Sequence, residues 1–482
     1  MNKSFKHIPK EQRKKIMLVC DDIRVHSGVA TVAKEIVIHT AHHFNWVNVA
    51  GAIQHPEKGK VLDISSATNV EAKIEDSSVK LYCVDGYAQS AELQQILNTE
   101  KPDAVMLITD PRYFKHIFNM EDTIRKQCPL VYLNIWDDYP APMYNKPYYE
   151  ACDLLMGISK QTVNINKIVL ADCDNSKRVF KYVPHGLNHK EFYPIGKDHN
   201  EYEPLQQFRT NLVGENIDYV MFFNSRNIRR KQIPDAMLAF RSFLDSLPKE
   251  KADKCRFVLH TELVTDHGTD LGAVAEYLFG EKYEKNIVFS HQKLSRTQLN
   301  WLYNIADLQI LITSNEGWGL TVTEAMLTGT PVIANVTGGM QDQMRFVDEN
   351  GKWFTPSADV PSNHRGTYKE HGEWMFPVYP TSRSVQGSPQ TPYIFDDRCS
   401  WEDVCDRIKE IYELTDEERK AKGLKGREWA LSDEAGFTAE HQAQRVMEAF
   451  EELFSVWEPR EDFEIVNATE YKGRFLNHKI TY

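Results

Sequence analysis

The chain has 482 residues, of which 41% are hydrophobic and 26% are charged, and its formal net charge is −12. This length is enough for two or three domains with substantial cores. The acidic balance argues against tight nucleic-acid binding, which needs a basic surface. No apolar stretch approaches the roughly 20 residues of a membrane helix, no signal peptide is apparent, and the eight cysteines stand singly. We therefore expect a cytoplasmic protein with reduced thiols and no transmembrane segment.

Residues 1–195 are predicted to form a first α/β domain. Its predicted strands are short, continuous apolar runs at 16–20, 46–52, 79–84, 104–108, 130–135 and 154–159. Helical patterns separate several of these strands, at 29–40, 90–97 and 160–167. Strands that alternate with helices predict a doubly wound parallel sheet. In such a sheet, ligands bind at the carboxyl ends of the strands.

Small and polar residues follow two of these predicted strands, and a histidine lies near the end of the domain. Gly28 comes after the first strand, where its lack of a side chain lets the backbone approach a ligand. Asp137 and Asp138 follow the strand at 130–135, and either could orient an acceptor hydroxyl or serve as a base. The alternative for both acids is a structural, capping role. His185 lies near the end of the domain, where it either lines the cleft or packs as a structural histidine.

Residues 196–216 read as an interdomain linker, and residues 217–430 as a second α/β domain. The predicted strands of this domain lie at 219–223, 257–260, 286–290, 308–312 and 332–333, and its helices at 235–247, 295–305, 320–327 and 401–414. The segment 350–398 is long and mostly non-periodic, which predicts either a flap over the acceptor or a dimerisation arm. Residues 431–482 contain a long amphipathic helix at 434–457 and a tail.

The stretch 308–344 has the order strand, glycine loop, helix, strand. Backbone N–H groups of the loop Gly317–Gly319 and the helix N-terminus behind it favour a phosphate. Glu316 and Glu324 flank this turn, eight positions apart. Carboxylates beside a phosphate are suited to accept hydrogen bonds from ribose or hexose hydroxyls. The predicted ligand therefore carries a diphosphate and sugar hydroxyls, whereas the alternative is two acids without a role.

The letters EGWGLTVTEAM, followed by GTPVIA and TGG, resemble the E-x7-E signature of retaining glycosyltransferases of the GT-B fold, family 4 type (glycosyl transferases group 1). The resemblance implies two doubly wound, Rossmann-like domains that face a cleft, with a C-terminal helix that crosses back onto the first domain. It also implies that Glu316 binds the donor sugar and Glu324 the nucleotide ribose.

The resemblance extends to the other candidate site residues. The implied catalytic residues are Glu316, Arg226, Lys231 and Asp137. The implied donor-binding residues are Glu324, Gly317, Trp318, Gly319, Leu320, Gly28 and His291. Asp138 and His185 are expected on the acceptor side of the cleft. Arg226 and Lys231 match the family pattern R-x4-K, and fixed cations there would stabilise a leaving nucleoside diphosphate. The neighbouring Arg229 and Arg230 are expected to be solvated.

The chain also departs from the family pattern. Many relatives carry a His-Asp pair where this chain has Trp136 and Asp137, so the histidine contact to the sugar is missing unless His185 or His26 supplies it. Family members need no metal, and we expect no metal and no cofactor besides the nucleotide-diphosphate sugar as co-substrate. The segment Asp172-Cys-Asp174 matches the metal motif D-x-D of the other glycosyltransferase fold, but such a short match is common by chance.

The expected function is a retaining glycosyltransferase (EC 2.4) that moves a sugar from a nucleotide-diphosphate sugar to an acceptor hydroxyl. The insertion and the letters VTGGMQDQM resemble glycosyltransferases encoded by bacteriophages. A phage-type transferase for hydroxymethylated bases in DNA is therefore a second possible function, which the acidic charge disfavours. A nucleotide-sugar epimerase, a phosphorylase and a non-catalytic sugar-nucleotide-binding protein are also compatible with this architecture. The acceptor class stays open between a glycan, a small molecule and modified DNA, and so does the oligomeric state.

Overall fold

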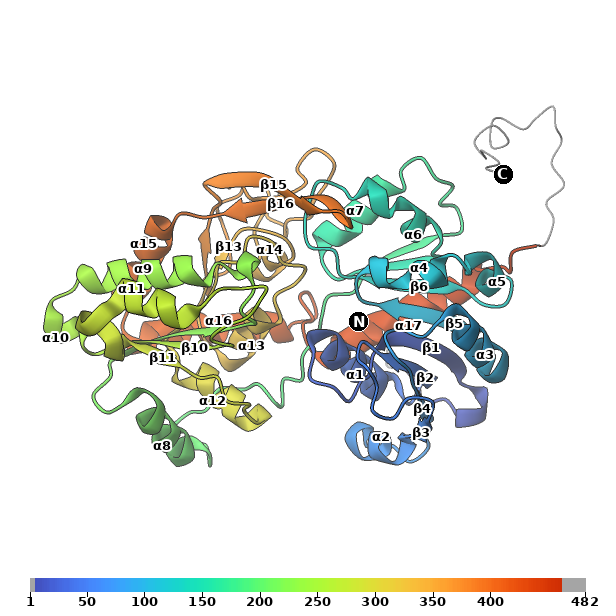
Figure 1. The fold of residues 1–482 in the computed structure, drawn as a ribbon, viewed down its shortest axis with the longest axis horizontal. Helices are drawn as coiled ribbons and strands as arrows, with labels where there is room; N and C mark the ends of the chain where they lie inside the picture. The colour runs from blue at the N-terminus through green and yellow to red at the C-terminus, as the bar shows by residue number, and fades with distance from the viewer. Residues whose placement is uncertain (1–4, 462–482) are drawn as a thin grey trace.

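The computed structural model describes residues 5–461, which form two α/β domains side by side (Figure 1). An eight-stranded sheet organises the first domain and a six-stranded sheet the second. The central strands of both sheets are buried apolar runs, as expected where helices cover both faces of a parallel sheet. The two doubly wound domains predicted from the sequence are confirmed.

The first sheet has the strand order β3-β4-β2-β1-β5-β6-β7-β8, and its pairs are parallel apart from β3 with β4. Its strands are β1 (Lys14–Asp21), β2 (Phe44–Gly51), β3 (Val61–Asp63), β4 (Val79–Cys83), β5 (Ala104–Ile108), β6 (Leu130–Asn134), β7 (Leu154–Gly157) and β8 (Val179–Tyr182). Its helices are α1 (Gly28–Thr40), α2 (Ser65–Ala72), α3 (Ser90–Glu100), α4 (Lys115–Phe118), α5 (Glu121–Arg125), α6 (Lys146–Glu150) and α7 (Lys160–Val169).

The second sheet is parallel throughout, with the strand order β11-β10-β9-β12-β13-β14. Its strands are β9 (Tyr219–Asn224), β10 (Cys255–His260), β11 (Ile287–Phe289), β12 (Leu308–Leu311), β13 (Val332–Asn335) and β14 (Met375–Val378). Its helices are α9 (Ile233–Asp245), α10 (Lys249–Ala252), α11 (Leu271–Tyr283), α12 (Arg296–Ile305), α13 (Leu320–Thr328), α14 (Met340–Met344), α15 (Trp401–Tyr412) and α16 (Asp416–Leu431).

Two segments differ from the sequence expectation. The linker 196–216 contains a helix, α8 (Tyr202–Val213), which packs against α12. The insertion 350–398 supplies the edge strand β14 of the second sheet and then an antiparallel hairpin of β15 (Ser382–Ser388) and β16 (Thr391–Arg398). The hairpin, drawn in orange in Figure 1, reaches from the second domain towards α7 and α6 of the first.

The last helix, α17 (Ala439–Val456), returns to the first domain, as predicted. It packs against α1, and the Phe450 ring lies 5.3 Å from the Phe44 ring, centroid to centroid. Just before it, Thr438 pairs with Leu187 in an isolated parallel bridge, so the outgoing and returning segments lie side by side. The predicted tail beyond residue 461 lies outside the described residues. No helix of residues 5–461 is long and apolar enough to cross a membrane.

Candidate active site

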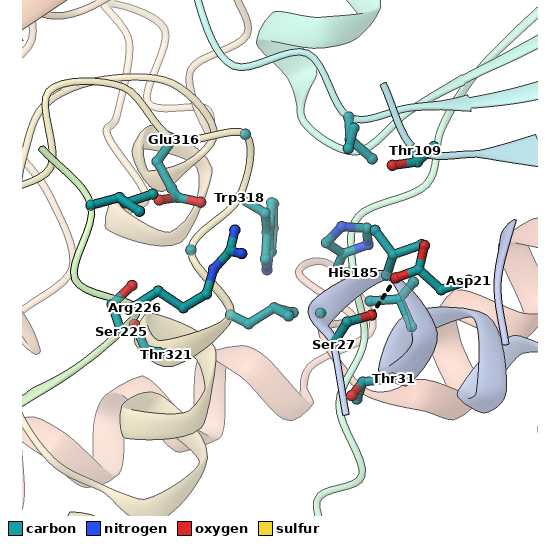
Figure 2. Close-up of a pocket in the computed structure, with 18 of the residues that line it drawn as sticks. Asp21, Ser27, Thr31, Thr109, His185, Ser225, Arg226, Glu316, Trp318 and Thr321 are labelled. Atoms are coloured by element: carbon teal, nitrogen blue, oxygen red, sulfur yellow. Dashed lines mark hydrogen bonds between the residues drawn. The ribbon is translucent and has the colours of Figure 1, made fainter. Parts of the chain in front are cut away.

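A cleft of about 1600 Å³ lies between the two domains. Loops after β1, β5 and β6 line it from the first domain, and loops after β9, β10, β11 and β12 line it from the second. Figure 2 shows Glu316 and Arg226 on one side of this cleft and Asp21 and Thr109 on the other. Both parallel sheets therefore direct the carboxyl ends of their strands into one space, where ligands of doubly wound folds bind.

Glu316 lies in the loop between β12 and α13, and two cations from the loop after β9 bind its carboxylate. Its Oε2 accepts hydrogen bonds from Arg230 Nη1, at 2.9 Å, and from Lys231 Nζ. Burial opposes the charge of this carboxylate, but Arg230 and Lys231 outweigh it and lower the pKa of Glu316 to about 2. Glu316 is therefore ionised at neutral pH, and because both contacts use Oε2, its Oε1 remains available to a ligand hydroxyl.

Arg230 belongs to the site, and the expectation that it is solvated was wrong. A short 3-10 turn, Arg229–Lys231, directs Arg230 and Lys231 towards the cleft while Arg229 stays exposed. Arg230 Nη1 also donates to the Asn315 carbonyl oxygen, at 2.5 Å. Although burial opposes its charge, Glu316 raises the pKa of Arg230, so the guanidinium remains a permanent cation at the centre of the cleft.

Arg226 lines the same cleft but is exposed. In contrast to Arg230, it forms no hydrogen bond or ion pair through its side chain with any residue of the described range 5–461. Figure 2 shows its guanidinium pointing into the cleft beside Trp318. A cation that is held in a cleft without a carboxylate partner is available to an anionic ligand.

The N-terminus of α13 faces the cleft without a side-chain cap. Its N-cap residue is Gly319, with a left-handed φ of 86° and no side chain to satisfy the first N–H groups. The predicted donor residues Gly317, Trp318 and Leu320 line the cleft around it. A β-carbon at Gly317 would lie 2.7 Å from the Ile135 carbonyl oxygen of the first domain, so only glycine permits this approach. The free N–H groups of α13 can receive a phosphate.

Glu324 lies one turn further along α13, and it also lines the cleft. Its Oε2 accepts hydrogen bonds from the Tyr303 hydroxyl, at 2.5 Å, and from Asn224 Nδ2, at 3.4 Å. Burial raises the pKa of this carboxyl. The fold thus brings the two predicted glutamates to the same cleft, one on either side of the uncapped helix N-terminus.

The first domain contributes Gly28, Asp137 and His185 to the cleft. Gly28 is the first residue of α1, whose N-terminus is already capped because Ser27 Oγ accepts a hydrogen bond from the Ala30 N–H. Burial raises the pKa of Asp137, which lies in the field of Arg230 and Glu316. These positions agree with the placement expected from the sequence.

Asp138 does not line the cleft, which corrects its expected place on the acceptor side. It is fully buried and accepts hydrogen bonds from the Tyr139 N–H, at 2.8 Å, and from Gln161 Nε2, at 2.9 Å. Burial raises the pKa of Asp138 well above its usual value, and Asp397 of the hairpin raises it further. The reason is the hairpin β15–β16, which covers Asp138 through a contact that the sequence does not reveal.

The remaining predicted residues are also placed by the structure. His291, after β11, is exposed at the cleft, and Trp136 and His26 line it too. Asp172 is exposed and bound by Lys146, and neither acid of the D-x-D match lines the cleft.

Sequence reasoning missed several cleft-lining residues. These are Asp21, Asp110, Arg112, Tyr113, Thr391 and Ile394. Asp21 is the last residue of β1 and the next three follow β5, so the rule that ligands bind at strand ends could have found them. The other two belong to the hairpin, in the segment 350–398 that the sequence predicts as a flap over the acceptor or a dimerisation arm, but no signal singled out these two residues.

Residues 218–361 match a family model described as Glycosyl transferases group 1. Over 222 residues the chain is 27% identical to alpha-monoglucosyldiacylglycerol synthase of Acholeplasma laidlawii, covering 46% of this chain and 50% of the relative. Over 116 residues it is 26% identical to an uncharacterized glycosyltransferase of Methanocaldococcus jannaschii, covering 24% of this chain and 27% of the relative. The chain thus spans about half the length of the first curated relative and about a quarter of the second.

Two solved structures resemble nearly the whole chain. Sucrose-phosphate synthase from Thermosynechococcus elongatus matches with a TM-score of 0.61 and 14% identity over 92% of this chain and 100% of that chain. Anabaena HepE, in complex with UDP and glucose, matches with a TM-score of 0.60 and 14% identity over 91% and 100%. At this identity the likeness shows the fold alone. The protein therefore has the GT-B fold of glycosyltransferases, and residues 218–361 of its second domain match the family Glycosyl transferases group 1.

Proposed function

We propose that the protein is a glycosyltransferase that moves a sugar from a nucleotide-diphosphate sugar to an acceptor hydroxyl. The observation that carries the proposal is the ionised Glu316, which Arg230 and Lys231 hold beside the uncapped N-terminus of α13. Arg226, whose side chain has no partner within residues 5–461, lies in the same cleft. This arrangement offers acceptors for sugar hydroxyls next to donors for phosphates. The match to Glycosyl transferases group 1 supports it.

The donor would lie along the second domain. In the proposed arrangement, the diphosphate meets the α13 N-terminus and Arg226, the transferred sugar meets Glu316, and the ribose meets Glu324. Negative charge builds on the nucleoside diphosphate as its bond to the sugar breaks, and Arg226, Lys231 and the helix N-terminus would stabilise that charge. We propose that these groups do the work that a metal ion would otherwise do. Transfer activity that survives a chelator would support this part.

Retention of the anomeric configuration is also part of the proposal. It rests on the likeness of residues 316–326 to retaining enzymes. Acceptors would enter from the first domain, where Asp137 lies beside residues 315–319, which we call the donor loop. A DNA-modifying transferase, an epimerase and a non-catalytic binding protein gain no support from the matched family. NMR of the transferred sugar would report its anomeric configuration directly, and an inverted product would overturn retention.

Donor hydrolysis without acceptor tests the proposal. The purified full chain would be incubated with UDP-, GDP- and ADP-sugars, and release of the nucleoside diphosphate would be measured. We expect slow release from one donor class and a loss on the order of 100-fold in Glu316→Gln. The amide oxygen of Gln would face the donors Arg230 and Lys231, so its NH₂ group would replace the acceptor Oε1, and the negative charge would be lost. The matched control is Glu417→Gln, at an exposed position on α16. If no donor is hydrolysed and no nucleoside diphosphate raises the Tm, the proposal is wrong.

A further inference from the structure

The first-domain side of the cleft, where the acceptor would enter, is acidic. Within residues 5–461, the Asp, Glu, Lys and Arg side chains that line it from this domain are Asp21, Asp110, Arg112 and Asp137. Arg112 is already neutralised, because its Nε and Nη2 donate to the two carboxylate oxygens of Asp110, at 2.8 and 2.6 Å. The electrostatic field on this side therefore favours an uncharged ligand over an anion.

Asp21, at the end of β1, is a buried carboxylate that no cation binds within the described residues. Its Oδ2 accepts a hydrogen bond from Ser27 Oγ, at 2.5 Å, drawn as a dashed line in Figure 2. Its Oδ1 accepts one from the Tyr87 hydroxyl, at 2.9 Å. Burial and the charge of Asp21 raise the pKa of Tyr87, so this hydroxyl keeps its proton. Because a carboxylate has about four acceptor positions, Asp21 can still accept from a ligand in the cleft that it lines.

Tyr113, in the loop after β5, is an aromatic side chain that remains open at the cleft. It lines the cleft and is 59% exposed. The Tyr87 ring, whose hydroxyl binds Asp21, lies 5.7 Å from the Tyr113 ring, centroid to centroid. Tyr87 itself packs edge-on against the buried Phe114 ring, at 5.1 Å. An exposed aromatic ring near a carboxylate suits a sugar, whose apolar C–H face packs on the ring while its hydroxyls donate to the carboxylate.

The distribution of exposed apolar side chains argues against a lipid acceptor. Within the described part of the chain, the large hydrophobic side chains with the greatest exposure are Val61, Val70, Tyr113, Met143, Val264, Tyr277, Val385, Leu424 and Val456. Of this set, Tyr113 alone lines the cleft. An acyl chain needs a contiguous apolar surface, which a single tyrosine does not supply.

We infer that the acceptor is an uncharged carbohydrate, with one sugar ring packed against Tyr113 and its hydroxyls bonded to Asp21. The inference rests on the proposed function, to which it adds the class of acceptor. A phosphorylated acceptor, and DNA in particular, would bring negative charge next to Asp21, which no cation offsets within residues 5–461. A sugar hydroxyl can also accept, and Arg112 Nη1, which makes no hydrogen bond within that range, can donate to it.

Binding of the full chain to an oligosaccharide array tests the acceptor class without any sugar transfer. The array would carry neutral oligosaccharides and the same oligosaccharides with one phosphate group. UDP, GDP and ADP would be added in turn to fill the donor side of the cleft. We expect at least one neutral oligosaccharide to bind, and its phosphorylated form to bind about tenfold more weakly. Failure of every neutral oligosaccharide to bind, or tighter binding of the phosphorylated forms, would overturn the inference.

Substitutions at Tyr113 locate the bound sugar. Tyr113→Ala should weaken binding of the neutral oligosaccharide on the order of tenfold, whereas Tyr113→Phe should keep it, because the ring makes the contact. The matched control is Tyr277→Ala, at an 87% exposed tyrosine that does not line the cleft. Nucleoside diphosphate affinity should change by less than about twofold in all three variants. Equal effects of Tyr113→Ala and Tyr277→Ala on oligosaccharide binding would overturn the inference.

Asp21→Asn tests the discrimination against phosphate. Without the negative charge, the preference for the neutral oligosaccharide over its phosphorylated form should fall by about threefold or more. The control is Asp266→Asn, at an exposed position outside the cleft. An unchanged preference in Asp21→Asn would remove Asp21 from the inferred contact. Since Tyr113 lies at the surface, its variants test the sugar contact even if Asp21→Asn lowers the Tm.

Transfer assays separate this inference from the proposed function. The donor that the protein hydrolyses would be offered with the bound oligosaccharide, with diacylglycerol in phosphatidylcholine vesicles, and with hydroxymethylated DNA. We expect transfer to the oligosaccharide. Transfer only to diacylglycerol or DNA would overturn the inference and leave the proposed function intact. If no donor is hydrolysed but Tyr113→Ala weakens oligosaccharide binding, the proposed function fails and the carbohydrate site at Tyr113 stands.

Discussion

Arg226 and Arg230 are four positions apart in one loop, yet the fold gives them different surroundings. Arg230 is bonded to Glu316 and to the backbone of the donor loop, so it holds the site together. The Arg226 side chain has no partner within residues 5–461, so the folded protein gains little from its charge. Substitution of each arginine should therefore distinguish a structural role for Arg230 from a ligand-binding role for Arg226.

We predict that Arg226→Ala weakens nucleoside diphosphate binding by about 1.5–3 kcal/mol, the value of a hydrogen bond to a charged group. The free energy of unfolding should change by less than about 0.5 kcal/mol, because Arg226 has no side-chain hydrogen bond or ion pair to lose within the described residues. Calorimetric titration and urea unfolding measure the two quantities. The matched control is Arg229→Ala, an exposed cation of the same loop that does not line the cleft. Equal effects of the two substitutions on binding would contradict the prediction.

At the scale of elements, helix α7 is capped by both domains. Ser159 Oγ accepts a hydrogen bond from the Thr162 N–H, at 2.9 Å, as an ordinary N-cap. Asp342, on α14 of the second domain, accepts a hydrogen bond from the Lys160 N–H, at 2.9 Å. This carboxylate crosses the domain interface to complete a helix terminus. Burial raises the pKa of Asp342 to about 6.

This raised pKa gives a pH prediction for Asp342→Asn. The folded state binds the proton of Asp342 more tightly than the unfolded state, so this stabilisation is complete below about pH 4 and is lost as the pH rises through 6. Asn keeps an acceptor but does not titrate. The free energy of unfolding of the variant, relative to wild type, should therefore rise by about 2 kcal/mol between pH 4.5 and 7. Urea unfolding at both pH values measures it, with the exposed Asp359→Asn as control.

The hairpin β15–β16 is the second element that joins the domains. The Phe395 N–H donates to the Tyr139 carbonyl oxygen, at 2.7 Å, and the Tyr144 hydroxyl donates to the Tyr393 carbonyl oxygen, at 2.9 Å. On the other side, the Asp397 N–H donates to the Ser314 carbonyl oxygen, at 2.9 Å. The hairpin thus connects the loop after β6 to the loop that carries Glu316.

We predict that replacing residues 385–395 by two glycines, which removes Tyr393 and Phe395, leaves both domains folded but lets them separate. The hairpin strands pair only with each other within the described chain, so neither main sheet loses a strand. Small-angle scattering should show a larger radius of gyration, while nucleoside diphosphate affinity should stay within about threefold because the donor residues remain. An unchanged scattering curve would mean that the hairpin does not hold the domains together.

At the scale of the whole molecule, the stability of the first domain depends on α17, which follows the second domain in the sequence and packs back against α1. Phe450 is fully buried against α1 and the Phe44 ring. We predict that Phe450→Ala lowers the free energy of unfolding by about 3–5 kcal/mol, the usual result of truncating a buried aromatic side chain. Val456→Ala, at a 40% exposed position of the same helix, is the control. Similar losses of unfolding free energy in Phe450→Ala and Val456→Ala would contradict a special contribution of the contact between Phe450 and Phe44.

The sequence predicts the parts of this molecule that depend on local pattern. Strand β5 has the bounds that its apolar run predicts, 104–108, because the run has the length of a strand and polar, turn-forming residues bound it on both sides. Strand β14 was missed because its four residues include a proline and stand inside a long irregular segment. Helix α16 was missed because its residues are mostly charged and show no apolar stripe.

The candidate site divides in the same way. Glu316 and Glu324 could be found because both lie in one continuous motif whose geometry is local. Arg230 and Asp138 were misplaced because their surroundings come from residues more than 80 positions away. No periodicity or spacing records such contacts, since they form only when the chain folds.

The paired segments at Leu187 and Thr438 have a mechanical consequence. Within residues 5–461 the chain passes to the second domain and back through these neighbouring segments, which makes the second domain an insert on a double-stranded hinge. Any opening that keeps this pair intact must be a rotation about it. Figure 1 shows the hairpin at the upper edge of the molecule and the loop that leads to α8 on its lower side. Contacts away from this pair, such as those of the hairpin, would separate in such a rotation, whereas His185, two residues from Leu187, would move little.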